Sequence, residues 1–238
     1  FLYNESTQKF RCKTFIIRFV NMSFTIITLD PTNYLDALVF QENFFNAQLE
    51  KKDNGEKTSD TLILLQHTPV YTLGKSGDIN NLKIPIEETG AEFYQTKRGG
   101  DITFHGPGQL VVYPIFDTEN YGIRVREYVT KLEQCVIDCL ADYGLKGERL
   151  EDASGVWLDA DNEKARKICA IGLKVSRGIS MHGLAFNINT DLNYFDHIVP
   201  CGLDDKSVTS LEKELGKKMD FFEVQNKLIA QFQKQFKS

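Results

Sequence analysis

Two long segments carry apolar side chains at three- and four-residue spacings, which is the repeat of an amphipathic helix. In residues 124–143 the apolar positions are Val125, Tyr128, Val129, Leu132, Val136 and Leu140. In residues 220–236 they are Val224, Leu228, Phe232 and Phe236. Gly144 ends the first segment, and Asp220 with Glu223 supplies a capping pair for the second. Both segments are therefore predicted to be helices that pack one face on a sheet.

A weaker helical repeat follows Asp30 and Pro31, which suit an N-cap and a first helical position. Its apolar positions are Leu35, Leu38, Phe45 and Leu49, and they predict a helix that serves core packing. The polar residues 51–60 predict a surface loop, and residues 207–215 predict a further amphipathic helix. Shorter helical turns are expected at residues 85–90 and 191–198.

The remaining apolar runs are short and rich in β-branched residues, as in β-strands. They are residues 24–29, 61–65, 66–74 (a turn leading into a strand), 93–97, 109–115, 156–158, 167–175 and 179–189. The last two runs predict a hairpin. Because hairpins outnumber regular βαβ units, we expect an α/β fold of the α+β type, in which helices pack on a mixed β-sheet.

The chain shows no internal repeat and no linker that would divide it into domains. Residues 1–21 lack a starting methionine and have little helical or strand period, whereas residues 22–27 begin as a strand. We therefore interpret residues 1–21 as an N-terminal extension of uncertain origin, and residues 22–238 as a single domain. A length of 238 residues with 42% hydrophobic side chains is sufficient for one well-buried domain.

Charge and cysteine content narrow the class of protein. A net charge of -5 argues against a general binder of nucleic acid or of anionic membranes. No apolar run approaches the roughly 18 residues that span a bilayer, so a soluble protein with no membrane segment is expected. Five cysteines are an odd and sparse set for this length, which favours reduced thiols and a cytoplasmic location.

Cys135 and Cys139 lie four residues apart on a predicted helix, a spacing that two metal ligands can use. Neither a histidine nor a second cysteine pair nearby completes a set of four ligands. We therefore predict that both are core thiols and that the protein has no metal site.

Residues 98–109 are dense in conformationally special residues, with four glycines, one proline, Arg98 and His105. Glycine lets a main chain approach a ligand closely, while Pro107 stiffens the turn. A simple hairpin connection is one interpretation of this loop. Because it leads directly into the apolar strand of residues 109–115, where binding loops on rigid scaffolds tend to lie, we favour a ligand-binding loop.

Three further motifs follow this loop in the chain: Lys-Ile-Cys-Ala-Ile-Gly at residues 167–172, His-Gly-Leu-Ala-Phe-Asn at 182–187, and Pro-Cys-Gly at 200–202. With the glycine loop, and over residues 61–215, they resemble the lipoyl(octanoyl) transferases of lipoate biosynthesis. The resemblance implies the catalytic-domain fold of biotin and lipoate protein ligases. It also implies the first step of endogenous protein lipoylation, in which an octanoyl group passes from acyl carrier protein to a lysine of a lipoyl domain.

The resemblance also implies the partners of the enzyme. They would be acyl carrier protein, the lipoyl domains of 2-oxoacid dehydrogenases and the H protein of glycine cleavage. No cofactor is expected, because the acyl group arrives on the phosphopantetheine of the carrier.

Cys201 is the candidate nucleophile, since a cysteine thioester stays as reactive as the thioester donor. Its position in a loop between Pro200 and Gly202 favours access to substrate. A free cysteine is only a few per cent thiolate at neutral pH, so it needs activation. The resemblance assigns that activation to Lys167, which would also act as acid and base. From the residues alone, two other interpretations remain open, namely that Cys201 is a buried structural cysteine and that Lys167 is a solvated surface lysine.

The resemblance places substrate binding in three of these motifs. The residues concerned are Arg98, Gly99, Gly100, Asp101, Ile102, Thr103, Phe104, His105, Ala170, Ile171, Gly172, Gly183, Leu184 and Ala185. Backbone N–H groups near the glycines are candidate oxyanion donors. His67 and His182 are secondary candidates, because a lone histidine more often satisfies buried backbone groups.

Three other functions remain possible at this point. An ATP-dependent lipoate or biotin ligase would share the fold but would not need Cys201. An amidotransferase that moves octanoyl between lipoyl proteins would use it. A module that holds acyl carrier protein without turnover would use the loop alone. Finally, Lys164, Arg166, Lys167, Lys174 and Arg177 predict a basic rim for an acidic carrier protein.

Overall fold

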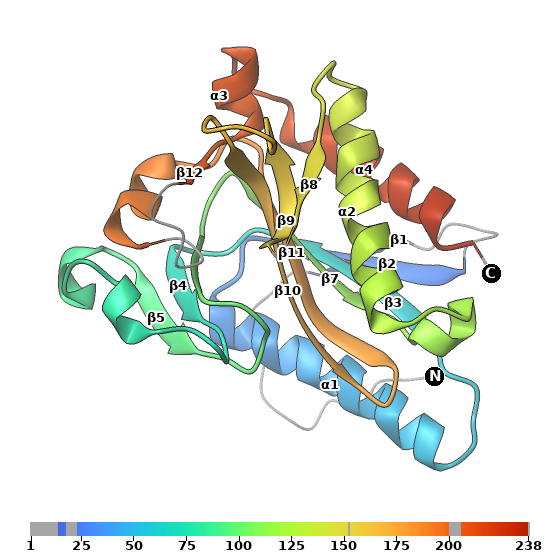
Figure 1. Ribbon diagram of the computed structural model, residues 1–238. Coiled ribbons are helices and arrows are strands. Elements are labelled where there is room, and N and C mark those ends of the chain that lie inside the picture. The colour runs from blue at the N-terminus through green and yellow to red at the C-terminus, as the bar shows by residue number, and fades with distance from the viewer. Residues whose placement is uncertain (1–13, 18–22, 152, 200–205, 238) are drawn as a thin grey trace.

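The computed structural model describes residues 14–17, 23–151, 153–199 and 206–237, and within them the strands form two sheets (Figure 1). The larger has nine strands, eight of them in the order β1-β2-β3-β7-β11-β10-β9-β8, while β12 pairs with β10. The smaller has the order β5-β4-β6. The two sheets contain parallel and antiparallel pairs, so the predicted mixed β-sheet architecture is confirmed.

The strands β2–β5, β7 and β9–β11 follow the apolar runs of the sequence, whereas β1, β6, β8 and β12 had no such run. In chain order they are β1 Thr14–Ile17, β2 Phe24–Leu29, β3 Asp60–Leu65, β4 Val70–Leu73, β5 Glu92–Gln95, β6 Ile102–His105, β7 Gln109–Ile115, β8 Glu148–Leu150, β9 Ala153–Leu158, β10 Arg166–Ser176, β11 Ile179–Asn187 and β12 Ser207–Val208. The predicted hairpin is confirmed as β10 paired antiparallel with β11.

Helices cover both faces of the large sheet. Figure 1 shows α2 (Val125–Ala141) and α4 (Phe221–Gln235) side by side, away from α1 (Tyr34–Asp53). The short helix α3 spans Leu211–Leu215, and the 3₁₀ turns are η1 Ile79–Asn81, η2 Ile86–Glu88, η3 Thr118–Tyr121 and η4 Leu192–His197. None of the helices that the structure describes combines the length and apolar character needed to cross a membrane.

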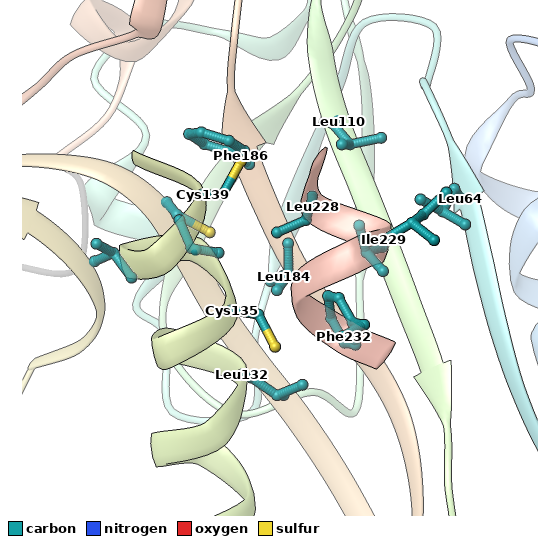
Figure 2. Close-up of a cluster of buried hydrophobic side chains, with 14 of the residues drawn as sticks. Leu64, Leu110, Leu132, Cys135, Cys139, Leu184, Phe186, Leu228, Ile229 and Phe232 are labelled. Carbon is teal, nitrogen blue, oxygen red and sulfur yellow. The ribbon is translucent and has the colours of Figure 1, made fainter. Parts of the chain in front are cut away.

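The space between α2, α4 and the sheet holds the main apolar core (Figure 2). The predicted stripe of α4 is confirmed, because Val224, Leu228, Phe232 and Phe236 are fully buried. Cys135 and Cys139 of α2 face the same core, and burial raises the pKa of Cys139 to about 12. They are core thiols, as predicted.

The start of α1 differs from the prediction. Its N-cap is Asn33 rather than Asp30, and the Asn33 side chain accepts a hydrogen bond from the Asp36 N–H. Thr32 is held in an extended bridge to His67, which delays the helix beyond Pro31.

The buried face of α1 also differs from the prediction, because it consists of Tyr34, Ala37, Gln41, Phe45 and Gln48. Leu35, expected on the buried stripe, is 48% exposed. The rest of the predicted stripe faces the core, since Phe45 is buried and Leu38 and Leu49 pack partly buried against the same cluster. Gln41 and Gln48 belong to the buried face although they are polar.

Four other segments depart from the expectation. Residues 51–60 are not all loop, since α1 continues to Asp53 and Asp60 is a buried residue of β3. The expected helix at 207–215 is strand β12 followed by α3, which begins after the N-cap Ser210. Strand β6 lies inside the glycine-rich stretch. In the N-terminal extension, β1 pairs antiparallel with β2.

Candidate active site

A cavity of about 740 Å³ has walls from both sheets, α1 and the start of α2. It contains thirteen of the fourteen residues predicted to bind substrate: Arg98, Gly99, Gly100, Asp101, Ile102, Thr103, His105, Ala170, Ile171, Gly172, Gly183, Leu184 and Ala185. Lys167 and His182 line it as well. Motifs far apart in the chain therefore meet at one place.

Phe104 is the predicted residue that does not line the cavity. It packs in a separate small core, stacked on Tyr194 with ring centroids 4.3 Å apart, and it also contacts Tyr71 and Phe195. Because neighbouring residues of a strand point to opposite faces, the binding face of β6 leaves Phe104 on the other side. Its role is to anchor β6.

Close contacts between main chains explain two glycines that face the loop at residues 98–101, namely Gly74 and Gly172. The Gly99 N–H donates to the Leu173 carbonyl of β10 at 2.9 Å. A Cβ on Gly74 would lie 2.1 Å from the Gly100 carbonyl oxygen, and one on Gly172 would lie 2.8 Å from that of Gly99. Side chains at Gly74 or Gly172 would push the loop away from the cavity wall.

Arg98 fixes this loop to β4. It is buried, and its guanidinium donates to the carbonyl and hydroxyl oxygens of Thr72 and to the Gly99 carbonyl. A planar group with five donors suits such a multiple contact.

A buried chain of hydrogen bonds starts at the Thr72 hydroxyl. His105 Nε2 lies 3.3 Å from that hydroxyl, and His105 Nδ1 lies 2.8 Å from Gln109 Oε1. The Gln109 amide donates to Asn187 Oδ1, and the Asn187 amide donates to the Thr209 carbonyl. Because Gln109 Oε1 can only accept, His105 carries its proton on Nδ1, and the Thr72 hydroxyl, which accepts from Arg98, donates to His105 Nε2.

The histidines around the cavity are held neutral. Burial, followed by the charges of His67 and Arg98, lowers the pKa of His105 to about 3. Burial lowers the pKa of His67 to about 4. His67 lies behind the cavity wall, where its ring contacts the Thr32 carbonyl at 2.9 Å and the Tyr113 hydroxyl at 2.7 Å. It holds Tyr113, a lining residue, in place.

Lys167 occupies a rigid position in the cavity wall. Its backbone pairs with Trp157 of β9 on one side and Val208 of β12 on the other, and its carbonyl accepts the Thr209 N–H at 3.0 Å. A register shift between Lys167 and Cys169 interrupts the pairing with β9. The side chain is buried, with its ammonium 4.6 Å from the centre of the Trp157 ring.

The segments at residues 170–172 and 183–185 lie opposite each other in the β10–β11 pair. Ala170 pairs with Ala185, and Gly172 pairs with Gly183. A Cβ on Gly183 would lie 2.0 Å from the Val112 carbonyl oxygen of β7, so that position accepts only glycine. Small residues on both strands leave room for an apolar chain beside the sheet.

His182 has a left-handed backbone, with φ at 61°, inside strand β11. Its N–H donates to Gln41 Oε1 of α1 at 3.2 Å. Burial, followed by the charges of Arg98 and Lys174, lowers the pKa of His182 to about 3. Strained backbone of this kind is concentrated at functional sites.

Several lining residues had no motif to identify them. Tyr34 comes from the first turn of α1, Val125 and Val129 come from the start of α2, and Leu150 and Ala153 come from the β8–β9 hairpin. The helical stripe of α2 predicted Val125 and Val129 as core residues. Val125 is 47% exposed, and both residues lie in the first turns of α2, where they line the cavity instead.

Cys201, with Pro200 and Gly202, lies outside the residues that the structure describes. On either side of this segment, the Val199 N–H donates to the Asn81 carbonyl, and Lys206 lines the cavity. The described cysteines Cys135, Cys139 and Cys169 are buried free thiols, and they do not line the cavity. Within the described part of the chain, no three histidine, cysteine or acidic residues are grouped as metal ligands.

Acidic residues pair with two cations of the expected basic rim. Arg166 forms ion pairs with Glu214 and Asp159, and Arg177 pairs with Asp53 of α1. The Lys174 ammonium lies 4.7 Å from the centre of the Phe45 ring. These contacts take up part of the positive charge of the segment, and docking of an acidic carrier protein on it stays a prediction.

Comparisons with known proteins fit this geometry. The family model of the lipoyl protein ligase A/B catalytic domain matches residues 33–233. An octanoyltransferase of Parabacteroides distasonis is 51% identical over 203 residues, which are 84% of this chain and 92% of that protein. An octanoyltransferase of Porphyromonas gingivalis is 50% identical over 207 residues, which are 85% of this chain and 42% of that protein. The chain thus spans less than half of that relative's length.

A solved structure, the crystal structure of lipoate-protein ligase A bound with ATP, has the same fold. It superposes with a TM-score of 0.71 over 90% of this chain and 85% of that chain, at 15% identity. The ligase-type catalytic-domain fold expected from the motifs is confirmed.

Proposed function

Because the chain belongs to the lipoyl protein ligase A/B catalytic-domain family and is an acyltransferase, we propose that it transfers octanoyl from acyl carrier protein to a lipoyl-domain lysine. Its octanoyltransferase relatives support the acyl group. The lipoyl domains of 2-oxoacid dehydrogenases and the glycine cleavage H protein are the acceptors we infer. Free buried thiols at Cys135, Cys139 and Cys169 are in keeping with a cytoplasmic location.

The observation that carries the proposal is that Lys167 lines the same cavity as the small and apolar residues 170–172 and 183–185. We infer that this part of the wall holds a saturated acyl chain. Burial of such a chain contributes about 0.8 kcal/mol per methylene.

We propose a two-step reaction. The Cys201 thiolate attacks the donor carbonyl, a carbon–sulfur bond forms, and the bond to the phosphopantetheine sulfur breaks. The Lys167 ammonium gives its proton to the departing sulfur. The lipoyl lysine amine then attacks the Cys201 thioester, the amide forms, and neutral Lys167 takes the proton lost by the amine while the thiolate leaves. The thiolate and the ammonium are thereby restored.

Lys167 has a second function in this scheme. Its positive charge favours the thiolate over the thiol of Cys201, which lowers the pKa of the nucleophile. Backbone N–H groups of the loop at residues 98–101 are the donors we infer for the oxyanion.

Mass spectrometry of the protein after mixing with octanoyl-acyl carrier protein tests the first step. We expect one octanoyl adduct on Cys201 that hydroxylamine removes and that Cys201→Ser does not form. An adduct on another cysteine would overturn the assignment. Octanoate with ATP, and an octanoylated lipoyl protein, are the alternative donors. Faster transfer from either one would replace this function with that of a ligase or an amidotransferase.

The Lys167→Ala variant tests the acid–base role that we propose for Lys167. We expect kcat/KM to fall by about 10²- to 10⁴-fold, as for loss of a general acid and base. The matched control is Lys164→Ala, which removes an exposed lysine three residues away. Equal activity of the two variants would exclude Lys167 from the chemistry.

A further inference from the structure

Strand β10 changes its neighbour just after Lys167. Residues 169–176 of β10 pair with β11, whereas Arg166 and Lys167 pair with β12. Strand β9 pairs with β10 between residues 166 and 170 on the other edge, so β11 and β12 follow one another along the same edge of β10. Because β12 has only two residues, it is shorter than an ordinary strand and its own ladder holds it weakly. The strand beside Lys167 therefore needs a further attachment.

The Asn187 side chain supplies this attachment. Asn187 is the last residue of β11, and its side-chain amide donates to the carbonyl of Thr209, directly after β12, at 3.0 Å. The Thr209 N–H donates in turn to the Lys167 carbonyl at 3.0 Å. Thr209 is fully buried, and its hydroxyl donates to Glu214, which pairs with Arg166. Asn187 thus joins the end of β11 to the end of β12 at the place where one strand replaces the other.

Gln109 of β7 fixes the orientation of the Asn187 amide. The two residues are cross-strand partners in the β7–β11 pair, and the Gln109 amide donates to Asn187 Oδ1 at 2.9 Å. An amide whose oxygen is engaged in this way directs its nitrogen to the opposite side, which here is the side of Thr209. Both side chains are buried, and neither of these two described residues lines the cavity. They therefore act on the site only through the residues that they hold.

The backbone at Lys167 depends on this link. Without the Asn187 donor the Thr209 carbonyl would be buried and unpaired, which shifts an equilibrium about 5- to 100-fold toward a locally open state. Opening breaks the bond from the Thr209 N–H to Lys167 and detaches β12. The Lys167 backbone would then be paired on the β9 edge alone, and its ammonium would no longer be fixed above the Trp157 ring.

We propose that Asn187, oriented by Gln109, is a positioning residue for Lys167, because it secures the sheet where β10 changes its neighbour. This inference rests on the proposed function, in which Lys167 exchanges protons with the substrate. A misplacement of a reacting group by about 1 Å can reduce a rate about a hundredfold. The inference thus adds two buried residues to those that determine the rate.

Hydrogen exchange of the Thr209 amide, followed by NMR, tests the contact without any transfer reaction. In Asn187→Leu, which keeps a similar size and loses both polar atoms, we expect exchange of this proton to be about 5- to 100-fold faster. Gln109→Met should also accelerate it, because the Asn187 amide is then no longer oriented. If Asn187→Leu does not fold, an unchanged exchange rate in Gln109→Met would overturn the inference.

Asn189→Leu is the matched control. Asn189 lies two residues after Asn187, and its side chain makes two hydrogen bonds to the main chain of Met219, just before α4. This variant also loses bonds between an asparagine and a distant main chain, but it keeps those that reach Lys167. Exchange of the Thr209 amide should therefore stay within about twofold of the wild-type rate.

Steady-state kinetics with octanoyl-acyl carrier protein separates positioning from general destabilisation. We expect Asn187→Leu to lower kcat about 10- to 100-fold and to leave KM within about threefold, because the cavity wall keeps its side chains. Asn189→Leu should keep both constants near their wild-type values. Wild-type exchange at Thr209 in Asn187→Leu, or an equal fall of kcat in the two variants, would overturn the inference and leave the proposed function intact. Failure of the wild-type protein to transfer octanoyl would overturn the proposed function, while the exchange rates still decide whether Asn187 holds the backbone at Lys167.

Discussion

On the α2 and α4 side of the large sheet the buried side chains are aliphatic, aromatic or thiol, whereas the α1 side buries Gln41 and Gln48 beside its apolar residues. Both sides use the same strands, whose neighbouring residues point to opposite faces. The first side packs against itself and gives stability. On the α1 side, Gln41 and Gln48 accept hydrogen bonds from backbone N–H groups, and one of these is the His182 N–H at the cavity.

The difference shows how one sheet can supply both a core and a site. An apolar face needs no specific partner for each atom, so it tolerates close packing everywhere. A polar face must satisfy each donor and acceptor, and it therefore fixes the backbone at defined points. Here the fixed point is the left-handed turn of main chain at His182.

The largest effect is expected on the apolar side. Phe232→Ala removes a fully buried ring from the core between α2 and α4, and the unfolding free energy should fall by about 3–5 kcal/mol. Urea denaturation measures the loss, and the kcat/KM for octanoyl transfer of the folded variant should stay at its wild-type value. A lower kcat/KM would mean that the two sides of the sheet are coupled.

Acidic pH should lower the unfolding free energy through three buried histidines near the cavity. His105 and His182 line the cavity, and His67 lies behind its wall. The folded pKa values of His67, His105 and His182 lie at about 4, 3 and 3, below the ordinary 6.5. The stability they contribute is therefore complete above pH 6.5 and is lost as pH falls toward 3–4, because the unfolded chain binds protons first. The loss is up to about 1.4 kcal/mol per pH unit for each histidine.

Urea midpoints at pH 7.5 and pH 5.5 measure this loss. Burial raises the pKa of Asp60, but carboxylates titrate mainly below this range, so they do not mask the histidines. Equal midpoints at the two pH values would show that the three imidazoles are not held neutral by the fold.

The smallest effect on stability is expected from Gln41→Leu. It leaves the His182 N–H without its acceptor, so the unfolding free energy should fall by about 1–3 kcal/mol. The kcat/KM for octanoyl transfer should also fall, because the main chain at His182, which lines the cavity, is no longer held. Gln48→Leu is the control, since Gln48 lies on the same face and accepts the Ser59 N–H. If both variants lower kcat/KM equally, Gln41 acts only through the stability of α1.

Periodicity predicted the elements that pack by apolar contact. Helices α2 and α4, strand β7 and the β10–β11 hairpin follow from apolar repeats that burial enforces. On α1 it placed Leu38, Phe45 and Leu49 on the core side correctly, but it also placed the exposed Leu35 there and missed the buried polar residues Gln41 and Gln48. It also failed at residues 207–208, where only the distant partner β10 makes a strand of two residues.

The motifs identified most of the cavity but not all of its lining. Gly172 and Gly183 mark close approach of main chains and Gly100 has a positive φ, and all three line the cavity. Tyr34 carries no such signal, since a tyrosine in the first turn of a helix is ordinarily a packing residue. The directed chain from Thr72 to Thr209 also joins residues that only tertiary structure brings near one another.

The pairing of β10 with both β9 and β12 at Lys167 has an entropic consequence. Fixing the backbone of one residue costs about 1–2 kcal/mol of conformational entropy. A lysine on a loop would meet that cost each time a substrate bound. At Lys167 the cost is met once, when the chain folds, so the binding energy of the acyl chain remains available to orient the reacting groups.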